Sequence, residues 1–319
     1  MPPLIKPNPV NYNSGRELRA FLEERGLGMR KKFGQNFLIN PRVRSGLLDA
    51  MELREGDEVW EIGPGLGAMT TGLLERGARV TAFEIDPAFG AILRELFAGE
   101  TPGSFRLVEG DALKTWRGVE ARPAEELFLF GNLPYNVGAA LLADFIESGR
   151  LFRRIVVTVQ REVASRMTAV PSSADYSSFS VLCSSVYKVR PLFVIKGPSF
   201  YPAPNVDSQG VRLDLNPVRG ELPKLFYPLV RGLFSSRRKA VRNTLSAFAA
   251  SVMAKPVSPN GGSSAARDAV AARDAVAAKD AAVEVLNRTG ISGDRRPETL
   301  DRDEFAALAA FLEEIVSNE

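Results

Sequence analysis

The segment Glu58-Val-Trp-Glu-Ile-Gly-Pro-Gly-Leu-Gly67 carries the strongest structural signal in the chain. A short apolar run followed at once by glycines at positions 63, 65 and 67 is typical of a buried strand that turns sharply into a helix and leaves room for a ligand against the main chain. A lone glycine-rich turn is weak evidence, because any tight turn favours glycine. The interpretation therefore depends on the sequence around it.

Strand-like runs alternate with helical patterns from about residue 58 to residue 215, which predicts an α/β domain built on a doubly wound parallel sheet. Helices are expected at 68–76, 88–97, 139–148 and 162–167, and a proline-rich ordered loop at 198–204. The expected strands are Glu58–Ile62, Arg79–Phe83, Phe105–Glu109, Leu127–Phe130, Ile155–Gln160, Tyr187–Ile195 and Val211–Leu215.

After Pro217 the sequence has helical spacing at 222–231, 238–248, 281–286 and 303–316 and no convincing strand, so we expect a small all-helical second domain. An Ala-rich insert at about 256–283 repeats Ala-Ala-Arg-Asp-Ala-Val every six residues. Such a step rotates equivalent side chains by about 600° at 100° per residue, so no continuous apolar stripe forms. We expect the insert to be a surface helix and assign it no function.

Composition excludes several kinds of chemistry. The 319 residues include no histidine and one cysteine, Cys183. Histidine-dependent nucleophilic catalysis, imidazole acid–base catalysis and histidine-ligated metal are therefore excluded, and we expect no metal. A single cysteine fits a reduced, cytoplasmic setting. No signal-like or membrane-spanning run is found, so we expect a soluble protein without membrane contact.

Charge is distributed unevenly behind a net value of +3. Residues 1–46 carry +6, residues 150–166 carry +4 and residues 224–255 carry +7, whereas residues 47–149 carry −10. Charge runs are usually ordinary solvated helix faces. Here the absence of any acidic residue from 224 to 255 favours a basic face that binds a polyanion.

Two acidic residues at strand ends support a nucleoside cofactor. Glu84 ends the strand after the glycine-rich turn, where a carboxylate can accept both ribose hydroxyls, and Asp111 follows the third strand, where it can meet an adenine amino group. No basic residue lies between Glu55 and Glu75, so pyrophosphate would find no cation there. An acidic site favours a cationic cofactor, S-adenosylmethionine, over a dinucleotide.

The fourth strand ends in Gly-Asn132-Leu133-Pro134-Tyr135-Asn, which on its own could be a polar turn. Beside a methyl donor it has a chemical meaning. The Asn132 side-chain oxygen and the Leu133 carbonyl can accept both hydrogens of an adenine amine and favour a pyramidal nitrogen. Tyr135 can stack on the base, and Pro134 fixes the turn. In-line methyl transfer needs position and electrostatics but no histidine.

With these motifs in order, the sequence from about Lys31 to the C-terminus resembles the ribosomal RNA adenine N6,N6-dimethyltransferases, and most closely their bacterial small-subunit (16S), kasugamycin-resistance branch. The family implies a Rossmann-like S-adenosylmethionine-dependent methyltransferase sheet with a small helical RNA-binding domain. The motifs are Lys32-Phe-Gly-Gln-Asn-Phe-Leu38, the glycine-rich segment, Phe-Glu84-Ile-Asp86, Gly-Asp111-Ala, the Asn132 turn, Val-Gln160-Arg-Glu162-Val, Phe200-Tyr-Pro-Ala-Pro-Asn-Val-Asp207-Ser and Phe234-Ser-Ser-Arg-Arg-Lys-Ala-Val-Arg-Asn243.

The resemblance implies a role for each matching residue. Phe200 would be the second aromatic that sandwiches the target adenine against Tyr135, and Asn132 would serve both cofactor and amine. The implied cofactor residues are Asn36, Leu38, Gly63, Gly65, Glu84, Asp111 and Asn132, and the implied RNA-phosphate ligands are Arg237, Arg238, Lys239 and Arg242. The implied domains are an N-terminal extension at 1–30, a methyltransferase domain at 31–217 and a helical domain at 218–319.

The family dimethylates two adjacent adenines in the loop of the 3′-terminal hairpin of 16S ribosomal RNA, so the expected partner is the immature small ribosomal subunit, bound by a monomer. Three segments depart from the family pattern: Tyr176–Ser180, the repeat insert, and Arg296-Pro-Glu. Two alternatives remain: a large-subunit RNA adenine methyltransferase of the antibiotic-resistance type, and a mainly non-catalytic assembly factor. A DNA adenine methyltransferase is disfavoured, because no target-recognition domain is apparent.

Overall fold

The computed structural model describes residues 9–28, 35–120, 122–134, 137–218, 220–254 and 264–317, with side chains omitted from 264 to 272. The chain divides into two compact units. Unit 1 comprises Met1–Thr168 and Val186–Pro217, and unit 2 comprises Ala169–Ser185 and Val218–Glu319. The helical unit therefore includes a segment that the domain prediction placed inside 31–217. Among the described residues, no helix is long and apolar enough to cross a membrane.

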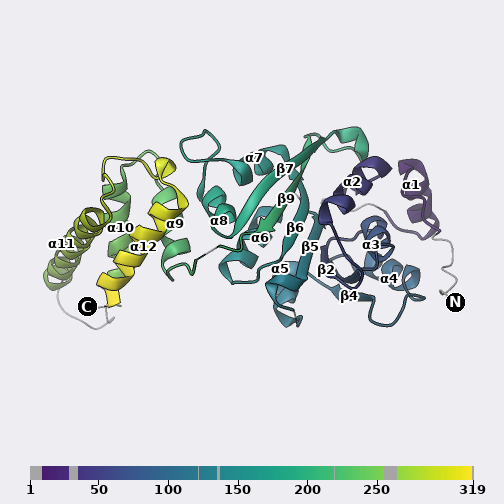
Figure 1. Ribbon diagram of the computed structural model, residues 1–319, viewed down its shortest axis with the longest axis horizontal. Coiled ribbons are helices and arrows are strands. Elements are labelled where there is room, and N and C mark those ends of the chain that lie inside the picture. Colours follow the sequence, from purple (N-terminus) through teal and green to yellow (C-terminus); the bar gives the residue numbers. More distant parts are fainter. Residues whose placement is uncertain are drawn as a thin grey trace. The chain divides into compact units, whose positions relative to one another are not determined.

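Unit 1 is built on a seven-stranded sheet in the order β4-β3-β2-β5-β6-β9-β7 (Figure 1). Every predicted strand is present, within three residues at each end. A separate two-stranded sheet pairs β1 with β8, with Leu38 opposite Phe200. The strands are β1 Phe37–Leu38, β2 Glu58–Ile62, β3 Arg79–Glu84, β4 Phe105–Glu109, β5 Leu127–Asn132, β6 Arg154–Gln160, β7 Tyr187–Ile195, β8 Phe200–Tyr201 and β9 Ser208–Leu215.

The prediction of a wholly parallel sheet is wrong at its last strand. Strand β9 inserts between β6 and β7 and runs antiparallel to both. A parallel pairing of β7 and β9 would need a crossover, usually through a helix, to bring the chain back to the starting edge. The connection at 196–207 contains only a short 3₁₀ turn, Gly197–Ser199, and β8, so the chain returns alongside β7.

Two helices of unit 1 that the sequence analysis did not predict precede β2, namely α1 and α2. Their start signals are present in the sequence: the Ser14 side chain accepts a hydrogen bond from the Glu17 amide at the start of α1, and Asn40 caps α2 just before Pro41. The helices of unit 1 are α1 Gly15–Glu24, α2 Pro41–Met51, α3 Ala68–Leu74, α4 Pro87–Leu96, α5 Ala112–Thr115, α6 Gly138–Glu147 and α7 Arg161–Thr168.

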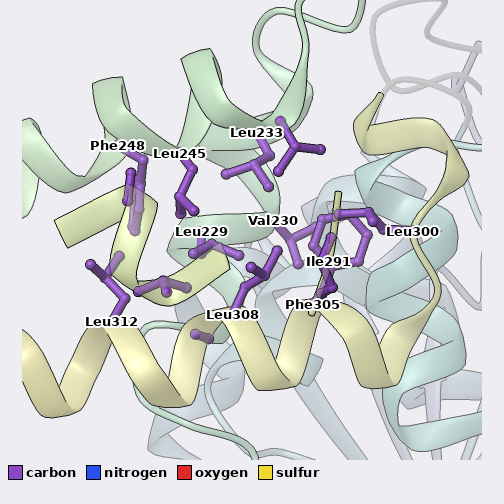
Figure 2. Close-up of a cluster of buried hydrophobic side chains, with 14 of the residues drawn as sticks. Leu229, Val230, Leu233, Leu245, Phe248, Ile291, Leu300, Phe305, Leu308 and Leu312 are labelled. Atoms are coloured by element: carbon purple, nitrogen blue, oxygen red, sulfur yellow. The ribbon is translucent and has the colours of Figure 1, made fainter. Parts of the chain in front are cut away.

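Unit 2 is helical, as predicted, and Figure 2 shows its buried core, which contains Leu229 and Val230 of α9, Leu245 of α10, and Leu308 and Leu312 of α12. The Ala169–Ser185 segment joins this core through Tyr176 and Val181, which explains why it belongs to this unit. The helices are α8 Ser178–Val186, which was not predicted and whose last residue lies in unit 1, α9 Phe226–Phe234, α10 Val241–Met253, α11 Ser264–Thr289 and α12 Arg302–Ser317.

The Ala-rich insert is helical, as predicted, within α11, but the prediction that it lies on the surface is wrong at its C-terminal end. Ala278, Ala282 and Val285 are buried in the core of unit 2. Their spacing is that of one helix face, because the repeat degrades after residue 276 and the following sequence no longer rotates its apolar side chains out of register. None of the side chains at 273–277 is buried.

Candidate functional site

The glycine-rich turn adopts the conformation that its sequence predicts. Gly63, Gly65 and Gly67 have φ values of +69°, +58° and +85°, a region in which only glycine is unstrained. A Cβ atom on Gly65 would lie 3.2 Å from the ring of Phe37, so the backbone there is also closely approached. Gly67 then forms the N-cap of α3. The strand-to-helix turn therefore leaves main-chain surface open toward the ends of the strands.

A cavity lies at the carboxyl ends of β2, β3 and β5, next to this turn. Two glutamates, two asparagines and backbone from the turn face apolar walls from β1 and the N-terminal segment. It is lined by Tyr12, Leu18, Gln35, Asn36, Phe37, Leu38, Glu61, Gly63, Pro64, Gly65, Leu66, Ala68, Met69, Glu84, Ile85, Phe89, Phe130, Asn132 and Pro134. Of the predicted cofactor residues, only Asp111 is not among them. Concave sites at strand ends are the usual ligand sites of α/β sheets.

Two buried carboxyl groups face this cavity. Burial raises the pKa of Glu61 to about 8, despite a 2.7 Å hydrogen bond from the Thr70 hydroxyl. Burial likewise raises the pKa of Glu84 to about 7, against the lowering effect of the amides of Asp86, 2.8 Å from Oε1, and Gly65, 3.1 Å from Oε2. Both are at most 5% exposed. Glu84 therefore ties the glycine-rich turn to the end of β3.

The two carboxyl groups fit a cationic ligand. Neither forms an ion pair with a basic side chain in the part of the chain that the structure describes. A buried carboxylate without a cation is costly, which is the physical origin of both raised pKa values. The sulfonium and ammonium groups of S-adenosylmethionine would supply the missing positive charge. The donor set of the site therefore suits this cofactor, as the acidic sequence predicted.

Asn132, the last residue of β5, is held at both ends of its side-chain amide. Its Nδ2 donates to the Asn36 carbonyl over 2.9 Å, and its Oδ1 accepts from the Thr158 hydroxyl on β6. The Leu133 amide donates 3.1 Å to the Thr158 carbonyl. An amide oxygen can accept two hydrogen bonds, so Oδ1 keeps one lone pair for a substrate amine. The side chain is thereby fixed at the cavity before any substrate arrives.

The Leu133 side chain anchors the turn from below. It is 2% exposed and occupies the space in which Cβ atoms on Gly131 and Gly138 would lie, at 2.6 Å and 2.9 Å from it. The Pro134 carbonyl accepts from the amides of Val137 and Gly138 at the start of α6. No residue that the structure describes donates a hydrogen bond to the Leu133 carbonyl. The role of that carbonyl as the second acceptor stays a prediction.

Besides Leu133, whose side chain anchors the turn from below, three predicted residues lie outside the cavity lining or outside the described chain. Tyr135 falls outside the described residues. Phe200 is 3% exposed and packs in the core of unit 1, beside Leu38 across the β1–β8 pair. Asp111 is the N-cap of α5 and accepts from the Leu113 amide at 3.1 Å. Their roles in binding adenine rings stay predictions.

The four predicted RNA ligands of unit 2 differ in their surroundings. Arg237 donates 2.8 Å to the Tyr176 carbonyl and lies 3.5 Å from Glu298, and Arg242 pairs with Asp294. Within the described chain, Arg238 and Lys239 have neither an ion pair nor a side-chain hydrogen bond. Lys239 also lines a polar hollow with Ser235, Ser236, Asn243, Thr244 and Ser251, together with Gly232, Ala247 and Phe248.

Sequence reasoning missed several side chains at the cavity. Gln35 lies inside the quoted Lys32–Leu38 motif but was given no role, and it donates 3.1 Å to Asp86. Thr158, which holds Asn132 from behind, lies just before the motif that begins at Val159 and was not singled out. Tyr12 and Leu18 lie in the segment that was set aside as an N-terminal extension. The apolar spacing of Leu18, Phe21 and Leu22 on α1 was the available signal that this segment is packed.

The family model and the relatives that match this chain all carry the names of ribosomal RNA methyltransferases. The profile of the family described as "Ribosomal RNA adenine dimethylase" matches residues 26–259. A Treponema denticola protein named "Ribosomal RNA small subunit methyltransferase A" is 40% identical over 307 residues, covering 96% of this chain and 97% of the relative. The protein of the same name from Treponema pallidum is 46% identical over 237 residues, covering 74% and 81%.

Two solved structures share the fold. A dimethyladenosine transferase from Plasmodium falciparum aligns over 86% of this chain and 96% of its own, with a TM-score of 0.67 and 24% identity. The 23S rRNA methyltransferase ErmE aligns over 86% and 99%, with a TM-score of 0.56 and 21% identity. At these identities the likeness concerns architecture alone, and it confirms the Rossmann-like methyltransferase sheet with a C-terminal helical part.

Proposed function

The chain belongs to the ribosomal RNA adenine dimethylase family, and from this premise we propose how its residues perform the family's reaction. It is an enzyme that transfers methyl groups from S-adenosylmethionine to N6 of adenines in 16S ribosomal RNA and forms N6,N6-dimethyladenosine. The two Treponema relatives that carry the small-subunit name are 40% and 46% identical to it, whereas the large-subunit enzyme resembles it in fold only. The small-subunit substrate therefore replaces the large-subunit alternative.

We further propose the form in which the substrate is met. The targets are two adjacent adenines in the loop of the 3′-terminal hairpin, and the RNA is presented by the immature small subunit to a monomer in the cytoplasm. Loop bases are poorly stacked, so little free energy is spent in bringing one into a pocket. The basic stretch at 224–255, with Arg238 and Lys239 unpaired among the described residues, supports phosphate binding by unit 2.

The cofactor would be held by the cavity residues. Glu84 would accept the ribose hydroxyls through the lone pairs left after binding two backbone amides, and Asp111 would accept from the adenine amino group. Asn36, Leu38, Gly63 and Gly65 would contribute the floor and the wall from β1. When bound, S-adenosylmethionine supplies an activated methyl group on a sulfonium that leaves as a neutral thioether.

The observation that carries the mechanism is the Asn132 amide fixed at the cavity and followed by a Leu133 carbonyl that accepts no hydrogen bond from described residues. The two oxygens accept the two hydrogens of the adenine amine and so direct its lone pair at the methyl carbon. Methyl transfer there would join the amine nitrogen to the methyl carbon in place of its bond to sulfur, and the turn leaves the amine proton to pass to water. Pro134 holds the turn, and Tyr135 and Phe200 sandwich the base.

Replacement of Asn132 by alanine tests this mechanism directly. We expect Asn132→Ala to abolish methyl transfer while RNA affinity stays near that of the wild type, because unit 2 supplies most phosphate contacts. Transfer would be measured with labelled cofactor, and affinity by filter binding. A variant that retained a tenth or more of the wild-type rate would exclude the amide as an essential acceptor.

The substrate is tested by competition among nucleic acids. Enzyme and labelled S-adenosylmethionine would be incubated with immature small subunits, with large-subunit RNA and with adenine-containing DNA, and a chelator would be present throughout because we propose that no metal takes part. Label in the small subunits, recovered as N6,N6-dimethyladenosine at two adjacent positions, is the expected result. Label only in the other two substrates would contradict the proposed function, and binding without label would favour a non-catalytic assembly factor.

A further inference from the structure

We propose that the N-terminal segment 9–28, which lies almost wholly before the part of the chain matched by the family, is a cofactor-binding element, with Tyr12 as its contact residue. The inference rests on the proposed function, because it takes the cavity to be the S-adenosylmethionine site. It assigns a role to residues that carry no family motif.

Two side chains of the N-terminal segment form part of the cavity wall. Tyr12 and Leu18 line the same cavity as Glu61, Glu84 and Asn132. Leu18 is 1% exposed, whereas Tyr12 is only half-buried, so its side chain is both packed in the wall and still open to a ligand. A wall built by a separate segment closes off a side of the cavity that the sheet and the glycine-rich turn leave open.

The second observation is that Tyr12 joins two walls of the cavity. Its hydroxyl donates to the Leu66 carbonyl, within the glycine-rich turn, at 2.8 Å. Its own carbonyl accepts from Arg44 at 3.0 Å, and the same Arg44 nitrogen donates to the Leu38 carbonyl of β1 at 2.9 Å. Displacement of Tyr12 would therefore loosen the turn and the β1 wall together.

The third observation is that the segment is firmly packed. Val10, Leu18, Phe21 and Leu22 are buried in one apolar cluster with Leu66 of the turn and with Phe89 and Ile92 of α4. Burial of these four apolar side chains removes their surface from water and so holds the segment against the turn and α4. Asn13 also accepts from Arg44, which is half-buried and has a pKa lowered by that burial. The segment is thus held against the cavity without a bound ligand.

The physical role follows from these contacts. The Tyr12 ring and the Leu18 side chain are uncharged and cannot neutralise a sulfonium, so they add apolar contact and exclude water from the carboxyl groups across the cavity. Their contribution should be the same for S-adenosylmethionine and for its uncharged-sulfur product, S-adenosylhomocysteine. This equality separates the segment's role from that of any group that recognises the sulfonium charge.

The test is calorimetric titration of the full-length chain with each cofactor form. Tyr12→Ala removes the ring and should raise both dissociation constants by about tenfold, whereas Tyr12→Phe removes only the hydroxyl that holds Leu66 and should raise them by about threefold. Arg19→Ala, on the exposed face of α1 where Arg19 pairs with Glu23, is the matched control and should bind as the wild type does.

Thermal unfolding of each cofactor-free variant verifies the fold. If Tyr12→Ala does not fold, Tyr12→Phe still decides the question. Wild-type affinity in both folded Tyr12 variants would overturn the inference and leave the proposed function intact. A wild-type chain that binds neither cofactor form would instead overturn the assignment of the cavity itself, and the inference with it.

Discussion

Thr158 is the residue on which the geometry of the reactive turn depends most. Through its hydroxyl it fixes the Asn132 side chain, and through its carbonyl it fixes the Leu133 amide, and it is itself only 1% exposed. Because the substrate amine must meet both acceptors of the turn at once, a small rotation of Asn132 would lose alignment without removing any group that contacts substrate. Thr158 is thus a positioning residue.

Thr158→Val tests this role, since valine keeps the shape of threonine without its hydroxyl. We expect the turnover number to fall about tenfold, because a tenfold change corresponds to the loss of about one hydrogen bond. The Michaelis constant for RNA should change little. Thr158→Ser keeps the donor and should recover most of the rate. Equal rates for the valine variant and the wild type, in steady-state assays on small subunits, would show that the hydroxyl does not position Asn132.

Glu61 makes the stability of the cofactor-free protein depend on pH. Its pKa is raised in the folded state to about 8 from an ordinary value of 4.5, so its protonated form stabilises the fold fully below pH 4.5, and this contribution is lost as pH rises through 8. Glu84, with a pKa raised to about 7, acts in the same direction. We therefore expect the melting temperature to fall between pH 5.5 and pH 8.5.

Glu61→Gln should flatten this dependence, because glutamine can still accept from Thr70 but never carries a buried charge. Thermal melts at several pH values should show the variant gaining several degrees on the wild type toward pH 8.5. Glu55→Gln, at an exposed position, is the control and should follow the wild-type curve. Parallel curves for Glu61→Gln and the wild type would contradict a buried carboxyl at this position.

Individual site residues could be predicted from the sequence where their role depends on their position at the end of a strand. Glu84 and Asn132 could be predicted because each ends a strand that a sequence pattern identifies. Thr158 and Tyr12 could not, because their partners lie 26 and 54 residues away and are chosen by tertiary packing. Phe200 was predicted from a motif, yet its ring lies in a core whose members the motif does not specify.

At the scale of elements, an ion-pair network joins α2 to the antiparallel part of the sheet. Asp214 on β9 accepts from Arg154 of β6 at 2.7 Å and from Arg212 at 2.8 Å, and both arginines also pair with Glu52 after α2. Burial alone would raise the pKa of Asp214, but these hydrogen bonds outweigh burial and lower it. The network secures the strand whose direction the sequence did not predict.

Asp214→Asn should therefore destabilise unit 1. It leaves Arg154 and Arg212, with side chains 13% and 15% exposed, and the exposed Arg190 short of one carboxylate. We expect a loss of about 2 kcal/mol in the free energy of unfolding. Urea denaturation followed by tryptophan fluorescence would measure it, since both tryptophans lie in unit 1. Glu126→Gln removes an exposed pair with Arg122 and is the control; a loss as small as the control's would argue against the network.

The elements themselves show what periodicity can and cannot reveal. Buried strands were found because each is a short apolar run between turn residues, and α9, α10 and α12 because their apolar spacing is helical. Strand direction was missed because it is decided by the connection, which has no periodic signal. Helix α8, Ser178–Val186, was missed because serines at 178, 180, 184 and 185 interrupt its apolar pattern.

For the whole molecule, the segregation of charge predicts how RNA affinity responds to salt. Arg238→Gln removes a cation without a partner among the described residues, so the slope of log affinity against log salt should become shallower by about one. Arg242→Gln is the matched comparison and should change the slope less, because its guanidinium already pairs with Asp294. Equal effects of the two variants on binding to small subunits would show that the ion pair opens on RNA.

Helix α11 gives the chain an unusual tolerance to length change. Among the side chains of α11 that the structure describes, from residue 273 onward, the first that is buried is Ala278, after the two intact repeats. Loss or gain of one six-residue unit at 265–276 would change the length of the N-terminal part of α11 and rotate it about the helix axis. The C-terminal part, from Ala278 onward, would keep its register in the core. Because tandem repeats in a gene expand and contract during replication, we expect natural variants of this protein to differ in repeat number while the buried residues from Ala278 onward are kept.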